Sequence, residues 1–235
     1  MKLERVNVPK ASDVLAQQLR QSIRSGALGV GALLPTEREL VEQTGLSRSS
    51  VREALRILEV EGLIEIRTGR SGGARVRRPG SDDFGRHLDL FIWGRNVSFE
   101  ELHEVREALE ALAAEGAARR RTESDIAMLI EKTEAVEAAV DDHPRYLAAN
   151  LEWHVAVARA SHNDLVIGMM GALAAAIHDA TAMEAFNSRE VCEATVKIHR
   201  SILAAIVAGD ADAARRRMAR HVVAAGKVAL AAAST

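Results

Sequence analysis

The first 62 residues show apolar positions at helical spacing, separated by turn signals. Residues 13–25 place their apolar side chains on one side of a helix, so they predict an amphipathic helix. Thr36 and Glu39 have the spacing of a capping box, which marks the start of a second helix. Gly45 suits the left-handed position that ends a helix, so the second helix is expected to stop there.

A third helix is expected after a turn of only two residues. Ser47 is a good N-cap, and the helical pattern continues to about Val60 before Gly62 stops it. Residues 63–67 and 74–77 then alternate in the manner of strands, on either side of a glycine-rich turn. Helix, helix, tight turn, helix and hairpin follow the order of a winged helix-turn-helix.

The rest of the chain shows helical patterns almost throughout. Residues 78–83 have the composition of a linker. Helix starts are expected near residues 98, 122, 142, 163, 188 and 210. Six or seven helices joined by short loops predict an antiparallel bundle. The fold class is therefore mainly α, with a winged helix-turn-helix domain in residues 1–79 and an all-α bundle in residues 80–235.

The third expected helix has one apolar and one polar face. Its apolar face carries Val51, Ala54, Leu55 and Leu58, and its polar face carries Arg48, Ser49, Arg52 and Arg56. Arginine can fork to guanine or clamp phosphates, and the start of this helix is the part that enters the major groove. A solvated face is the ordinary alternative, but the two capped helices, the short turn and the wing favour DNA reading.

The charge of the chain is unevenly distributed. Residues 1–80 carry a net charge of +5 and residues 81–235 carry −7, within a total of −2. This asymmetry indicates that the first part meets a polyanion. A second basic cluster, residues 215–217 with Arg220, is interpreted as the solvated C-terminal half of a helix, where cations suit the helix dipole.

Composition narrows the class of protein further. Aromatic residues make up only 3% of the chain, and abundant Ala and Leu favour helices. The apolar stretches are too short to span a bilayer, and the N-terminus lacks the apolar core of a signal peptide. Cys192 is the single cysteine, so no internal disulfide can form. A cytoplasmic protein without a membrane partner is expected.

Three motifs in the first 78 residues resemble the GntR-type transcription regulators: LPTEREL at residues 34–40, GLSRSSVREAL at 45–55 and LEVEGLI at 58–64. The resemblance implies a homodimer that reads a short palindrome in double-stranded DNA. It also implies that Arg38, Arg48, Ser49, Arg52 and Gly69 contact the operator. Val30 departs from the family, which commonly has proline there, and this difference should affect only a loop.

The simplest interpretation of the second domain is a helical bundle that serves only for dimerisation. Asn150 and His154 lie four residues apart, so they share one face of a helix. His199 and His221 lie among apolar residues on two later helices. Inward-facing histidines can converge on a metal, although a lone histidine on an apolar face is usually a satisfied core residue.

Further motifs resemble the FadR-type C-terminal ligand-binding domain, called FCD: LHEVREALE at residues 102–110, NLEWH at 150–154, HRSI at 199–202 and MARH at 218–221. The resemblance implies a divalent metal held at Asn150, His154, His199 and His221. It also implies that Arg106 binds the carboxylate of a small organic-acid effector. Family members usually have aspartate at the position of Asn150, so weaker metal retention is expected. Three nitrogen donors favour Zn²⁺ or Ni²⁺ over Mg²⁺ or Ca²⁺.

These features favour a ligand-responsive transcription regulator, most simply a repressor released by a metabolite, and not an enzyme. Two alternatives stay open. The same type of regulator could bind a long acyl-CoA without metal. The chain could also be a helical metalloenzyme. The residues fit this alternative less well, because no His-Glu-x-x-His motif is present and the winged domain would be unexplained.

Overall fold

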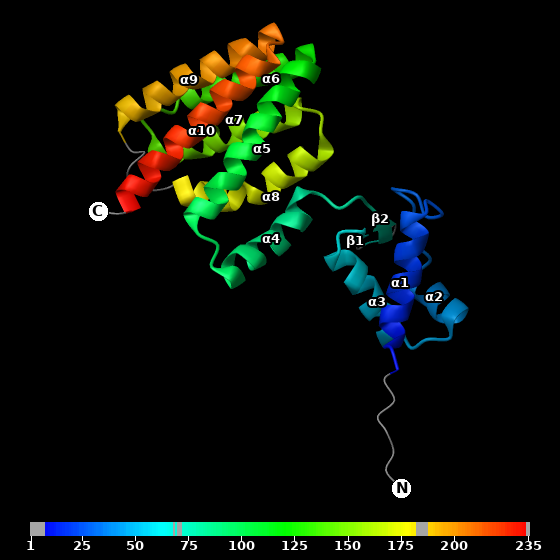
Figure 1. The fold of residues 1–235 in the computed structure, drawn as a ribbon. Coiled ribbons are helices and arrows are strands. Elements are labelled where there is room, and N and C mark those ends of the chain that lie inside the picture. The colour runs from blue at the N-terminus through cyan, green and yellow to red at the C-terminus, as the bar shows by residue number, and fades with distance from the viewer. Residues whose placement is uncertain (1–7, 68, 70–71, 182–187, 234–235) are drawn as a thin grey trace. The chain divides into compact units, whose positions relative to one another are not determined.

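The computed structural model describes residues 8–67, 69, 72–181 and 188–233, and for residues 175, 177–181 and 227–233 it describes the backbone alone. The chain forms two compact units, Met1–Asp83 and Phe84–Thr235, and each is described by itself (Figure 1). The described residues hold ten α-helices and one two-stranded sheet. This arrangement confirms the expected mainly α class.

The first unit is a winged helix-turn-helix. Its elements are α1 (Ala11–Arg24), α2 (Glu37–Thr44), α3 (Arg48–Val60), β1 (Ile64–Arg67) and β2 (Gly73–Val76). The strands are antiparallel, with Ile64 opposite Val76, and Leu33 adds an isolated bridge to Arg75. The expected first helix starts at Ala11, two residues earlier than the apolar pattern indicated.

Local sequence explains where α2 and α3 begin and end. Thr36 and Glu39 form the expected capping box, in which each side chain bonds the other residue's backbone amide. Gly45 ends α2 in the left-handed conformation with φ 68°, and the Ser47 side chain accepts a hydrogen bond from the Ser50 amide at the start of α3. The two helices are thereby fixed at a short turn.

The expected linker is partly helical. α4 (Ser81–Arg95) begins inside the segment with linker composition, and the first compact unit ends at Asp83. Arg77 donates two hydrogen bonds of 2.7 Å to the Asp83 carboxylate, and the Gly80 amide donates another of 2.7 Å. These bonds tie the first turn of α4 to the end of the wing, a contact that composition does not reveal.

The second unit is a helical bundle (Figure 1). Its remaining helices are α5 (Phe99–Arg120), α6 (Glu123–Glu137), α7 (His143–Ala160), α8 (Asp164–Thr181), α9 (Arg189–Ala208) and α10 (Ala211–Ala233). α5 packs along α10, α6 along α7, and α9 along α10. The helix starts expected near residues 98, 122, 142, 163, 188 and 210 agree with these bounds to within a residue or two. Fully buried core side chains include Trp153, Leu129, Met170, Ile202 and Met218.

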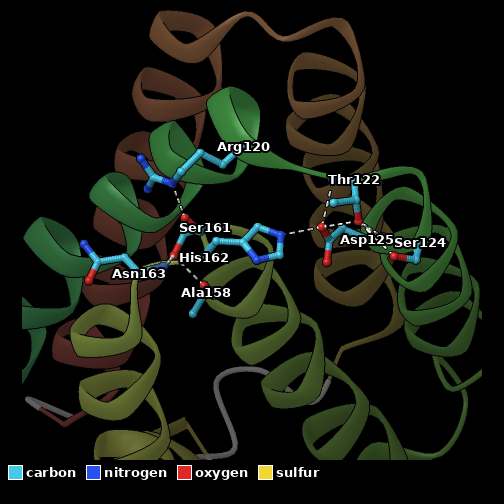
Figure 2. A network of polar contacts seen from close by, with 8 residues as sticks. All are labelled: Arg120, Thr122, Ser124, Asp125, Ala158, Ser161, His162 and Asn163. Atoms are coloured by element: carbon cyan, nitrogen blue, oxygen red, sulfur yellow. Dashed lines mark hydrogen bonds and ion pairs between the residues drawn. The ribbon is translucent and has the colours of Figure 1, made fainter.

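One end of the bundle is held by a polar network at three helix ends (Figure 2). His162, just after α7, points toward Asp125 in the first turn of α6, and its Nε2 lies 2.7 Å from Oδ2. Asp125 also closes the α6 capping box with Thr122. Arg120, at the end of α5, donates from Nε to the Ser161 carbonyl.

Among the described residues, no helix is long and apolar enough to be a membrane span.

Candidate functional site

The structure separates the two faces of α3 as the helical wheel predicts. Val51, Ala54, Leu55 and Leu58 are buried in the core of the first unit. Arg48, Ser49, Arg52 and Arg56 are exposed. Arg38, on α2, is also exposed, with four-fifths of its side chain accessible. Gly69 is exposed in the hairpin turn at φ 118°, a conformation that favours glycine.

Two of these arginines lie beside carboxylates in the free protein. Arg52 Nε is 2.9 Å from Glu37 Oε2, and Arg38 Nε is 3.8 Å from Glu42 Oε1. Exposed ion pairs of this kind contribute about 1 kcal/mol at most, so another anion can displace either carboxylate from its arginine. Ser49 Oγ lies 2.8 Å from Ser47 Oγ. The first turns of α3 therefore present both cations and a hydroxyl to solvent.

The histidines expected to converge do so in the centre of the bundle. His154 comes from α7, His199 from α9 and His221 from α10, and all three are buried. His199 Nε2 lies 3.1 Å from His221 Nε2, which lies 3.4 Å from His154 Nε2. One ring nitrogen from each of the three can therefore face a common point, within 4.8 Å of one another.

Aromatic packing and burial hold these rings in place. The Trp153 ring stacks on His199 with centroids 3.7 Å apart, while its Nε1 donates to Thr133 Oγ1 at 2.9 Å. Burial lowers the pKa of His199 well below its ordinary value, helped by the charges of His221 and His154. Burial and the charge of His154 lower the pKa of His221 to about 3. Neutral imidazoles with free lone pairs are the form that binds a metal.

A carboxylate that sequence reasoning did not single out completes this centre. Glu110, on α5, is only 1% exposed, and its Oε2 contacts His154 Nδ1. Its Oε1 accepts a hydrogen bond of 2.8 Å from Arg106 Nε, and Arg106 is only 4% exposed. Burial alone would raise the pKa of Glu110, but the charges of His154 and Arg106 outweigh it and hold that pKa well below the ordinary range.

Asn150 and Arg106 differ from the histidines in their hydrogen-bond partners. Asn150 lies one turn before His154 on α7, and its Oδ1 is buried without a hydrogen-bond partner among the described residues. A buried oxygen without a partner is costly unless a ligand satisfies it. Arg106 is not an open guanidinium, because Glu110 already occupies its Nε. The i, i+4 spacing of 106 and 110 was the one sequence signal for this pair.

A winged helix-turn-helix joined to a bundle with a buried polar centre defines a class: DNA-binding transcription regulators with a ligand-responsive domain. The match to family models makes this specific. The model described as "Bacterial regulatory proteins, gntR family" matches residues 11–73, and the FCD domain model matches residues 101–224. The chain belongs to the GntR family and carries an FCD domain. It is a transcription regulator and not an enzyme, which removes the metalloenzyme alternative.

Individual relatives agree with this assignment. The Uxu operon regulator of Haemophilus influenzae is 32% identical over 88% of this chain and 77% of its own length. The transcriptional repressor NanR of Klebsiella aerogenes is 30% identical over 91% of this chain and 83% of its own length. The solved structure of Streptococcus agalactiae GntR has a TM-score of 0.63 at 24% identity, covering 92% of this chain and 99% of that one, and shows the same fold.

Proposed function

We propose that this chain is a repressor of the FadR subfamily that binds a palindromic operator as a homodimer. A small organic acid, bound at a divalent metal in the FCD domain, releases the repressor from DNA. The observation that carries the proposal is the convergence of three buried imidazoles, His154, His199 and His221, inside a domain attached to a DNA reader. The name of the NanR relative, a transcriptional repressor, supports the direction of regulation.

The DNA-reading surface consists of the side chains that the first turns of α3 expose. Arg48, Ser49 and Arg52 enter the major groove. They lie at the start of α3, the second helix of the helix-turn-helix motif, and this end of that helix reaches base edges in such proteins. Arg38 meets the phosphate backbone beside the groove, and Gly69 lets the wing approach DNA closely. Their common exposure supports this assignment.

The residues present fit a divalent metal. The Nε2 atom of His221 lies 3.1 Å from that of His199 and 3.4 Å from that of His154, and the Asn150 oxygen one turn away lacks a partner among the described residues. His154, His199, His221 and Asn150 would hold the ion, and nitrogen donors favour Zn²⁺ or Ni²⁺. When bound, the ion supplies a positive charge that attracts a carboxylate. Arg106, whose Nε is held by Glu110, would offer its remaining N–H groups to the same effector.

The homodimer gains support from large apolar side chains on α4. Leu90, Phe91 and Trp93 expose 67%, 55% and 79% of their surface. Such a cluster in a water-facing helix is typical of a protein interface, and a second copy of the chain is the partner that a palindromic operator calls for.

Two measurements test the proposal. A gel-shift experiment on DNA upstream of the gene itself should show sequence-specific binding that weakens with salt. Elemental analysis of protein purified without a polyhistidine tag should find about one zinc or nickel per chain, and His199→Ala should lose it. Equal metal content in the two proteins would contradict the metal centre. A retained acyl-CoA, detected by native mass spectrometry, would instead favour the metal-free alternative.

A further inference from the structure

A basic cavity opens between α9 and α10 on the second unit. It has a volume of about 340 Å³ and is lined by Lys197, Ile198, Ser201, Arg217, Arg220 and His221. Three of these residues carry a positive charge, and no acidic residue lines the cavity. Arg217 is held in place, since its Nη1 donates to the Ser201 carbonyl at 2.5 Å. The basic run that sequence reasoning interpreted as a solvated helix end is thus divided, and part of it forms a concave site.

The cations of this cavity differ from the arginines around them. Arg189 pairs with Asp141 and Glu193, Arg200 pairs with Glu137, and Arg215 pairs with Glu115. Within the part of the chain that the structure describes, Lys197, Arg217 and Arg220 make no ion pair. Like charges gathered in a hollow repel one another, and an anion relieves that repulsion.

One of the residues that line the cavity, His221, also belongs to the candidate metal centre. His221 keeps the largest exposed fraction of the three histidines, at 7% against 3% for His154 and 0% for His199. Its Nε2 lies 3.1 Å from that of His199, so the same imidazole borders both the cavity and the buried centre. A ligand in the cavity would therefore contact the same imidazole that an ion held by the histidines would bind.

We propose that this cavity binds a second acidic group of the effector, so that the effector is an organic acid with two anionic groups. One carboxylate meets the metal centre and Arg106, and Arg217 and Arg220 bind the other group, a carboxylate or a phosphate. Arginine suits this role because it bonds both anions through paired N–H donors. This inference rests on the proposed function. Operator DNA is a poorer occupant, because the cavity is concave and one of its lining side chains, His221, is buried.

The test compares Arg220→Gln with Arg216→Gln in the full-length, zinc-loaded protein. Both changes remove one positive charge from α10, but only Arg220 lines the cavity, while Arg216 is exposed outside it. Affinities are measured by calorimetry for succinate, 3-phosphoglycerate and, as an acid with one anionic group, L-lactate. We expect Arg220→Gln to weaken succinate and 3-phosphoglycerate, the acids with two anionic groups, about tenfold and lactate less than twofold, and Arg216→Gln to change none of the three. The one of these two acids that binds the wild type more tightly identifies the second group.

Equal losses in the two variants would overturn the inference, because a long-range field would then explain the effect. So would a wild-type protein that binds neither succinate nor 3-phosphoglycerate more tightly than lactate. A loss of operator affinity in Arg220→Gln, with unchanged binding of these two acids, would assign the cavity to DNA. If Arg220→Gln does not fold, Arg217→Gln takes its place in the same comparison. Loss of metal in His199→Ala and the wild-type gel shift report separately on the proposed function.

Discussion

Glu110 Oε2 lies against Nδ1 of His154, although the two residues come from different helices, α5 and α7. A carboxylate in this position can accept a hydrogen bond from the Nδ1 N–H of His154, which leaves the Nε2 lone pair facing His221. Metal-binding histidines commonly have such a partner, which fixes the ring and makes the ligand more basic. Glu110 also supplies a negative charge near the centre, which Asn150 does not.

Replacing that carboxylate should weaken the metal centre. We expect Glu110→Gln to raise the dissociation constant for Zn²⁺ by about 10- to 100-fold, measured by competition with a chromophoric chelator. Glu107→Gln is the control, since it removes a charge from the same helix away from His154. Circular dichroism of the metal-free proteins checks folding, because the change also leaves the buried Arg106 without its partner. Identical zinc affinities in the two variants would remove Glu110 from the site.

Restoring the acid at residue 150 should have the opposite effect. Asn150→Asp places a carboxylate where the neutral amide oxygen now lies buried without a hydrogen-bond partner among the described residues. Attraction between this charge and a divalent ion should tighten zinc binding about tenfold or more. Asn163→Asp makes the same change at the start of α8, where the Asn163 side chain caps the helix, and should leave zinc binding unchanged. Weaker zinc binding in Asn150→Asp would show that residue 150 is not a ligand.

Much of the fold could be predicted because its signals are local. The capping boxes at Thr36 and Thr122 and the left-handed Gly45 each depend on residues within a few positions of one another. The start of α4 could not be predicted in this way. It is held by the bonds between Arg77 and Asp83, and composition gives no sign of them.

The candidate site, like the fold, has features that local sequence predicts and features that depend on contacts between distant residues. The convergence of His154, His199 and His221 could be anticipated, because each lies on an apolar helix face and the motifs matched a family. The contact between Glu110 and His154 could not, because it joins residues 44 positions apart on two helices whose packing one sequence does not give. For the same reason the run at 215–217 looked uniform, yet Arg215 pairs with Glu115 while Arg217 lines a cavity.

The two kinds of arginine in the DNA reader should be separable by experiment. Arg48→Ala should weaken binding to the operator by about 1–3 kcal/mol and relax the preference at one base pair, because it enters the groove. Arg38→Ala should weaken all sequences equally and reduce the salt slope by about one, because it contacts phosphate. Fluorescence anisotropy at several salt concentrations measures both. Arg56, exposed further along α3, is the comparison, and an equal loss in Arg56→Ala would contradict the assignment of Arg48.

The junction in Figure 2 should make the stability of the bundle depend on pH through Asp125. Burial raises the pKa of this carboxyl, but hydrogen bonds from Thr122 and the contact with His162 outweigh it, so the pKa is lowered in the fold. A lowered carboxyl pKa stabilises the folded state above the unfolded value of 3.8, and that contribution disappears as the pH falls through the folded value. Wild type should therefore exceed Asp125→Asn in unfolding free energy by about 1 kcal/mol at pH 7, a typical value for a helix cap. The difference should shrink below about pH 4, because protonated aspartate resembles asparagine.

Urea unfolding at each pH measures this difference in unfolding free energy. Glu123→Gln, which removes a charge from the same first turn without removing a capping bond, is the control. A difference that persists unchanged at low pH would mean that the shape of the side chain, and not its charge, holds this junction.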